Sequence, residues 1–98
     1  MKTYAGKRTI DGLVVTVDGR PLPVHDEVKS FTRYGFEWAY EGDSPRQLAL
    51  AILVDYLGDA DKALRLTEPF MKRVVADLDN DWELSGADID AALRALAA

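Results

Sequence analysis

The chain has 98 residues, with 12 Lys and Arg against 17 Asp and Glu, and a formal net charge of −5. It contains no cysteine, which excludes disulfides and thiolate zinc sites. This length fits a single domain, residues 1–98, large enough to bury a core.

The negative charge is concentrated near the end of the chain. Residues 1–76 contain eleven acidic and eleven basic side chains, whereas residues 77–98 contain six acidic side chains against Arg94 alone. Direct nucleic-acid binding is therefore not expected, because it requires a basic footprint. Two interpretations stay open: a solvated acidic face, or a surface for a basic partner that imitates nucleic-acid phosphates. The residues of that candidate surface are Asp77, Asp79, Asp81, Glu83 and Asp88.

The first quarter of the chain predicts a small antiparallel meander. The first eight residues lack an apolar run, so we expect no secretory signal and a cytoplasmic protein. Strands are predicted at 3–10, 13–17 and 20–23, because Asp-Gly turn pairs at 11–12 and 18–19 separate them. Pro21 and Pro23 cannot donate to a ladder, which places the third strand at an edge.

The middle of the chain contains its most apolar helix. We interpret residues 24–35 as a loop and residues 36–40 as a strand, because large aromatics alternate with smaller residues there. A helix is predicted over 45–57, with Ser44 as N-cap, Pro45 at the first helical position and Gly58 as terminator. It is apolar on nearly every face, which is typical of a buried helix, and it is too short to span a membrane.

The last forty residues predict further helices. Asp59 can cap a helix over 59–78, and Pro69 predicts either a kink or two short helices with Thr67 as the second N-cap. Residues 82–84 are interpreted as a link, and Ser85 and Asp88 form a capping-box-like pair before a helix over 87–97. The predicted class is α+β: a meander plus the 36–40 strand, packed on three to four C-terminal helices around the buried helix 45–57.

The acidic segment partly matches a calcium-binding loop. Asp77, Asp79, Asp81 and Asp88 stand at positions 1, 3, 5 and 12 of that pattern. Trp82 occupies the position that needs Gly, and Asp88 is shorter than the usual bidentate Glu. We therefore expect an acidic inter-helix loop without a metal, and we expect no cofactor.

A ligand niche is a second candidate site, around the start of the apolar helix. Gly42 and Ser44 present backbone N–H groups at a helix N-terminus, Arg46 could assist with an anion, and Glu37 and Trp38 precede them. No nucleophile–base constellation is evident in the sequence. His25 lies beside two acidic residues, but adjacent side chains usually diverge. The sequence therefore predicts a protein that is not an enzyme.

The chain resembles a small family of uncharacterised proteins, a domain of unknown function of bacteria, plasmids and phages. The resemblance covers almost the whole chain and rests on the blocks at 4–9, 15–19, 36–42, 44–53 and 82–85. The family's middle block reads Glu-Trp-Gly-Tyr, then a Gly-rich turn and Pro, then Gln-Leu-Ala-Leu-Ala. This chain departs from it with Ala39 in place of Gly and with Asp43 in the turn. The resemblance implies no reaction, cofactor or partner, but it is consistent with a mobile-element origin.

Two functions of different classes follow from these observations. The leading hypothesis is a non-enzymatic module that binds another protein through the acidic surface, in one version as a phage or mobile-element inhibitor of a host defence complex, similar to anti-CRISPR proteins. The alternative is a small-molecule or anion-binding domain centred on residues 37–44. No membrane interaction is expected, and the sequence leaves a homodimer open.

Overall fold

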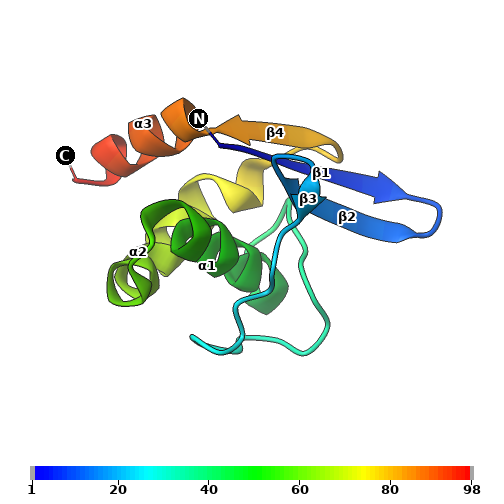
Figure 1. The fold of residues 1–98 in the computed structure, drawn as a ribbon, viewed down its shortest axis with the longest axis horizontal. Coiled ribbons are helices and arrows are strands. Elements are labelled where there is room, and N and C mark those ends of the chain that lie inside the picture. The colour runs from blue at the N-terminus through cyan, green and yellow to red at the C-terminus, as the bar shows by residue number, and fades with distance from the viewer. Residues whose placement is uncertain (1, 98) are drawn as a thin grey trace.

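The structure is a computed structural model, and it describes residues 2–97. The elements in chain order are β1 (Thr3–Thr9), β2 (Gly12–Val17), β3 (Arg20–Pro21), α1 (Asp43–Leu57), α2 (Ala60–Arg73), the 3₁₀ helix η1 (Val75–Asp77), β4 (Trp82–Ser85) and α3 (Gly86–Ala97). The predicted class is confirmed: an antiparallel four-stranded sheet packs against three helices (Figure 1). No helix in the described range is long and apolar enough to cross a membrane.

The sheet has the order β3-β2-β1-β4, so the first strand of the chain pairs with a strand close to its C-terminal helix. The predicted meander forms, with Tyr4 opposite Val17. Asp18-Gly19 makes the second turn as predicted, but the first turn lies one residue earlier than predicted, at Ile10-Asp11, and Gly12 begins β2. The fourth strand differs from the sequence-based expectation. Residues 36–40 are not a strand, and β4 takes the fourth place by pairing antiparallel with β1, Tyr4 opposite Leu84. Figure 1 shows β4 along the edge of the sheet that lies farthest from β3.

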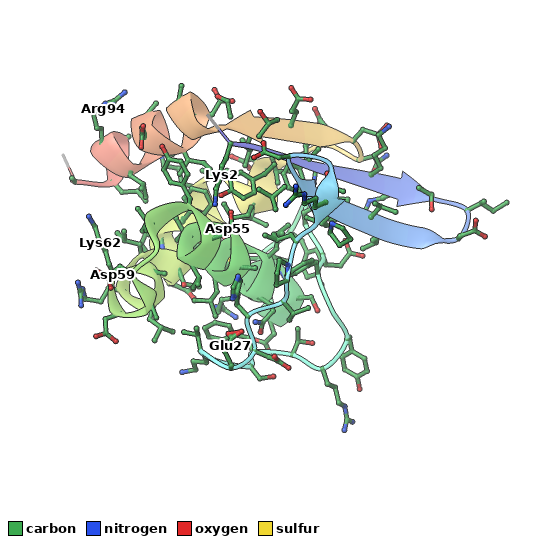
Figure 2. The ribbon with its side chains drawn as sticks, in the orientation of Figure 1. Lys2, Glu27, Asp55, Asp59, Lys62 and Arg94 are labelled. Atoms are coloured by element: carbon green, nitrogen blue, oxygen red, sulfur yellow. The ribbon has the colours of Figure 1, made fainter. Side chains whose placement is uncertain are left out.

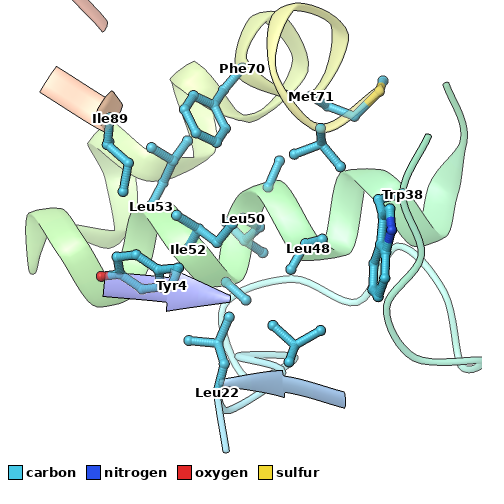
Figure 3. Close-up of a cluster of buried hydrophobic side chains, with 14 of the residues drawn as sticks. Tyr4, Leu22, Trp38, Leu48, Leu50, Ile52, Leu53, Phe70, Met71 and Ile89 are labelled. Carbon is cyan, nitrogen blue, oxygen red and sulfur yellow. The ribbon is translucent and has the colours of Figure 1, made fainter. Parts of the chain in front are cut away.

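Helix α1 lies at the centre of the core, as its sequence predicts. Its residues from Leu48 to Leu53 are all fully buried. Figure 3 shows α1 between Phe70 and Met71 of α2 on one side and Tyr4 and Leu22 on the other. A helix that contacts both a sheet and a second helix has no solvent-facing stripe over its central turns, which explains its uniform apolar sequence.

The helix ends match the sequence in some places and not in others. Gly58 ends α1 in the left-handed conformation (φ 66°), and the Asp59 carboxylate accepts from the Lys62 N–H at 3.1 Å, so both predictions are confirmed. The N-cap prediction is wrong, because the N-cap is Gly42, without a side-chain cap. The Ser44 hydroxyl instead donates to the Thr32 hydroxyl at 3.3 Å. The helix begins at Asp43 rather than at the predicted residue 45, so Pro45 is its third residue and not its first. Pro45 still lies in the first turn, where its missing N–H removes no helical bond.

Helix α2 continues through Pro69 to Arg73, so the alternative of two short helices is wrong. Thr67 does not start a helix; its buried hydroxyl donates to the Ala63 carbonyl at 2.7 Å, one turn earlier. The predicted helix over 59–78 also ends early, because η1 follows it. The capping-box prediction is confirmed: the Ser85 N–H donates to the Asp88 carboxylate at 2.9 Å, and the Asp88 N–H donates to the Ser85 hydroxyl at 3.1 Å.

The long segment between β3 and α1 has no regular structure, and a buried side chain of α1 holds part of it. Gln47 is fully buried. Its amide nitrogen donates to the carbonyls of Val24 and Lys29, both at 3.0 Å, and its oxygen accepts from the Phe31 N–H at 2.7 Å. Three backbone groups that lack a strand or helix partner are thereby satisfied.

Candidate functional site

The acidic candidate surface lies on β4 and the segment before it. Asp77, Asp79, Asp81 and Glu83 are all exposed. Side chains of a strand alternate between its two faces. Trp82 and Leu84 pack on the core, so Glu83 points to the opposite face of the sheet. Within residues 2–97, none of these four carboxylates forms an ion pair. These four carboxylates, which have no Lys or Arg between them in the sequence, are called the acidic patch below.

Asp88, the fifth residue of that set, has a structural role. Its carboxylate accepts from the Ser85 N–H in the cap of α3, although the residue is exposed. β4 occupies the middle of the segment that resembles a calcium loop, which makes it extended rather than looped. The described part of the chain contains no group of three His, Asp or Glu residues arranged to hold a metal ion.

The residues of the ligand niche contact other parts of the protein. Glu37 forms a two-point ion pair with Arg8 of β1, with nitrogen–oxygen distances of 2.7 and 3.1 Å. The Arg8 guanidinium also donates to the Trp38 carbonyl at 3.2 Å and lies 4.7 Å from the centroid of the Trp38 ring. The hydrogen bond from Arg8 lowers the pKa of Glu37 although burial opposes this. Arg8, rather than the Arg33 that lies closer in sequence, is thus the partner of Glu37.

The remaining niche residues also have partners within the chain. Arg46 forms ion pairs with Asp43 at 2.7 Å and with Glu68 of α2. Gly42 is extended and packs beneath Tyr40, because a Cβ atom there would lie 2.7 Å from the Tyr40 ring. The described residues form four surface cavities, and of the five niche residues only Arg46 lines one of them.

A cluster of titratable groups that the sequence did not predict joins β1 to α1. The Tyr4 hydroxyl donates to the Asp55 carboxylate at 2.6 Å, and the Lys2 ammonium lies 3.0 Å from the same oxygen (Figure 2). Burial, and then the hydrogen bond to Asp55, raise the pKa of Tyr4. Burial of Asp55 opposes its ionisation, but the hydrogen bonds from Tyr4 and Lys2 outweigh it and lower the pKa of Asp55. Neither group is poised for proton transfer near neutral pH.

A family comparison agrees with the resemblance noted in the sequence. Residues 4–95 match the model of a family of unknown function, DUF6166. The chain belongs to this family. A comparison with curated proteins and one with solved structures return no match. The DUF6166 match at residues 4–95 includes β2, β3, β4 and nearly all of β1, as well as most of α3. The pairing of β1 with β4 therefore falls within the matched residues.

Four surface cavities of this DUF6166 chain have volumes of about 300 to 410 Å³. One lies beside β2 and is lined by Leu13, Leu22 and Phe36, and another is polar and lined by Lys2, Arg20 and Asp55. A third lies between α3 and the other helices. The fourth lies between α2 and the segment that Gln47 holds, and its lining is the most distinctive chemically.

Proposed function

We propose that this DUF6166 protein is a non-enzymatic interaction module that binds a basic surface of another protein through Asp77, Asp79, Asp81 and Glu83. The observation that carries this proposal is that four exposed carboxylates fall within residues 77–83, with no Lys or Arg between them and no ion pair to any of them within residues 2–97. Other exposed acids without an ion pair in the described chain, such as Asp11, Asp26, Glu41 and Asp61, are scattered along the sequence rather than clustered. Unpaired surface charge accelerates the approach of an oppositely charged partner.

The position of the patch favours docking through side chains. β4 is an edge strand of four residues, and its acidic neighbours discourage another strand from extending the sheet. A partner would therefore contact the carboxylates of Asp81 and Glu83 on the outer face rather than add a strand. In one form of this proposal the protein acts in counter-defence, and its partner is a nucleic-acid-binding protein of a host defence complex. A row of carboxylates resembles the row of phosphates that such a partner binds in a nucleic acid.

Affinity capture with two matched variants tests the proposal. In the surface variant Asp77, Asp79, Asp81 and Glu83 are all replaced by Lys. In the control variant the same replacement is made at Asp11, Asp26, Glu41 and Asp61, which are also exposed. Both variants change the net charge equally and place the new charges at different sites, and circular dichroism of each checks that it is folded.

The wild-type protein and the control are expected to retain the same partner from a lysate of the native host, and the surface variant is expected to lose it. Raising the salt concentration should weaken capture by the wild-type protein, because salt screens exposed charges. Retention of the partner by the surface variant, or its loss from both variants, contradicts the proposal.

A further inference from the structure

An open surface cavity of about 390 Å³ lies between α2 and the segment that precedes α1, and none of its lining residues belongs to the acidic patch. Its apolar lining comes from Phe31 and Leu64, and Thr67 at its wall is almost fully buried. The volume falls in the range of small-molecule sites, which combine an apolar lining with a few polar groups that fix orientation. The cavity is therefore large enough for a ligand of about a dozen heavy atoms.

One wall of this cavity is held rigidly from inside the protein. Lys29 and Phe31 both line it, and the buried amide of Gln47 bonds the carbonyl of Lys29 and the N–H of Phe31. Three hydrogen bonds to one fully buried side chain fix the backbone of a segment that otherwise lacks regular structure. Such a wall needs little ordering when a ligand binds, which favours affinity.

The charges around the cavity favour an anion. Lys29, Arg46 and Arg65 line it against one acid, Glu68. The Glu68 carboxylate already forms ion pairs with Arg46 and with Lys72, whose ammonium lies 3.7 Å away. Lys29 and Arg65 form no ion pair within residues 2–97, and the Lys29 ammonium lies 5.3 Å from the centroid of the Phe31 ring. Two cations thus remain available beside an apolar surface.

We propose that this cavity binds a small amphipathic carboxylate, with its apolar body against Phe31 and Leu64 and its carboxylate between Lys29 and Arg65. Arg46 has a different role there: its ion pairs with Asp43 and Glu68 hold the start of α1 against α2. This site shares no residue with the acidic patch. It also differs from the ligand niche of Glu37, Trp38, Gly42, Ser44 and Arg46, of which only Arg46 lines this cavity.

A matched pair of probes tests the proposal by two-dimensional ¹H–¹⁵N NMR on the full chain. The probes are 4-phenylbutanoate and its neutral amide, which have nearly the same shape and differ in charge. The carboxylate is expected to give saturable shifts at residues 29–31 and 64–68 with a millimolar dissociation constant. The amide is expected to bind at least about tenfold more weakly, a difference of about 1.4 kcal/mol. The proposal is overturned if the carboxylate gives no shifts up to a concentration of about 10 mM. It is also overturned if both probes give equal shifts, or if the shifts are centred on other residues.

Paired variants separate the site from general charge effects. Lys29→Gln with Arg65→Gln removes the two available cations and is expected to weaken binding of the carboxylate about tenfold or more. Lys7→Gln with Arg73→Gln removes the same charge at exposed positions that line none of the four cavities, and it should leave binding unchanged. Both double variants change exposed side chains, so their amide spectra should remain those of the folded protein. Equal weakening by both pairs contradicts the site.

Discussion

At the scale of single residues, Ala39 is in a backbone conformation that its side chain disfavours. Its φ is +75°, and its N–H is held by the Val75 carbonyl at 3.1 Å. A left-handed conformation costs an L-residue about 1–2 kcal/mol, which glycine avoids. We predict that Ala39→Gly raises the free energy of unfolding by about 0.5–1 kcal/mol, measured by urea denaturation.

The matched control for this prediction is Ala91→Gly. Ala91 is exposed within α3, so the same replacement should lower stability by about 0.5–1 kcal/mol. A loss of stability in both variants would show that the conformation of Ala39 carries no cost.

Gln47 is the residue on which the segment before α1 depends most. Gln47→Leu would leave the Phe31 N–H and the carbonyls of Val24 and Lys29 without their recorded partner. We expect a loss of about 2–3 kcal/mol and faster hydrogen exchange at the Phe31 amide. Thr67→Val is the control, because the Ala63 carbonyl keeps its place in α2, and it should cost less than about 1 kcal/mol. Unchanged exchange at Phe31 in Gln47→Leu would contradict this role.

The Asp55 cluster predicts a dependence of stability on acid pH. The pKa of Asp55 is lowered from an ordinary value of 3.8, so its contribution is complete above that value and is lost as the pH falls through the pKa of the folded state. Asp55→Asn is expected to cost about 1.5–3 kcal/mol near pH 7, and this difference should shrink at acid pH. Denaturation of both proteins at several pH values measures it. The exposed Asp26→Asn serves as control, and a constant difference across the range for Asp55→Asn would contradict the prediction.

Local spacing decides which single-residue roles the sequence could predict. The sequence predicts the caps formed by Gly58, Asp59 and the Ser85–Asp88 pair, because each cap involves backbone only a few residues away. The roles of Ser44 and Glu37 depend on Thr32 and Arg8, which lie far away in sequence. No local pattern could indicate these contacts.

At the scale of elements, the attachment of β4 to β1 depends on the absence of a side chain at Gly6. A Cβ atom at this position would lie 2.3 Å from the Trp82 indole nitrogen. We expect Gly6→Ala to lower the free energy of unfolding by about 2–3 kcal/mol, because the indole must move. In a Trp82→Leu background the same replacement should cost at least about 1 kcal/mol less, measured as a double-mutant cycle. Additive losses would contradict direct contact between these residues.

The elements differ in how clearly their sequences define them. The central helix and the two hairpins carry strong local patterns and form close to where they were predicted, although α1 begins two residues earlier, at Asp43, and the first turn lies at Ile10-Asp11. β4 has only four residues, and its partner β1 lies at the opposite end of the chain, so nothing near it indicated a strand. The alternation of Phe36, Trp38 and Tyr40 is typical of a strand, but Ala39 turns the backbone and no neighbouring strand pairs with it.

At the scale of the whole molecule, the two proposed sites carry opposite charge. Four exposed carboxylates lie on β4 and the segment before it, and Lys29 and Arg65 line the cavity between α2 and the segment before α1. The acidic region was evident from the sequence because its four residues all lie within positions 77–83. The cavity was not, since its lining comes from three separate parts of the chain.

The central claim is that Asp77, Asp79, Asp81 and Glu83 bind a partner by their charge. The most direct test is the dissociation constant of the captured partner, measured by calorimetry for the wild-type protein, the surface variant and the control variant at low and high salt. We predict that the wild-type protein and the control bind alike, that salt weakens both, and that the surface variant binds at least about a hundredfold more weakly. A surface variant that binds as tightly as the wild-type protein contradicts the claim.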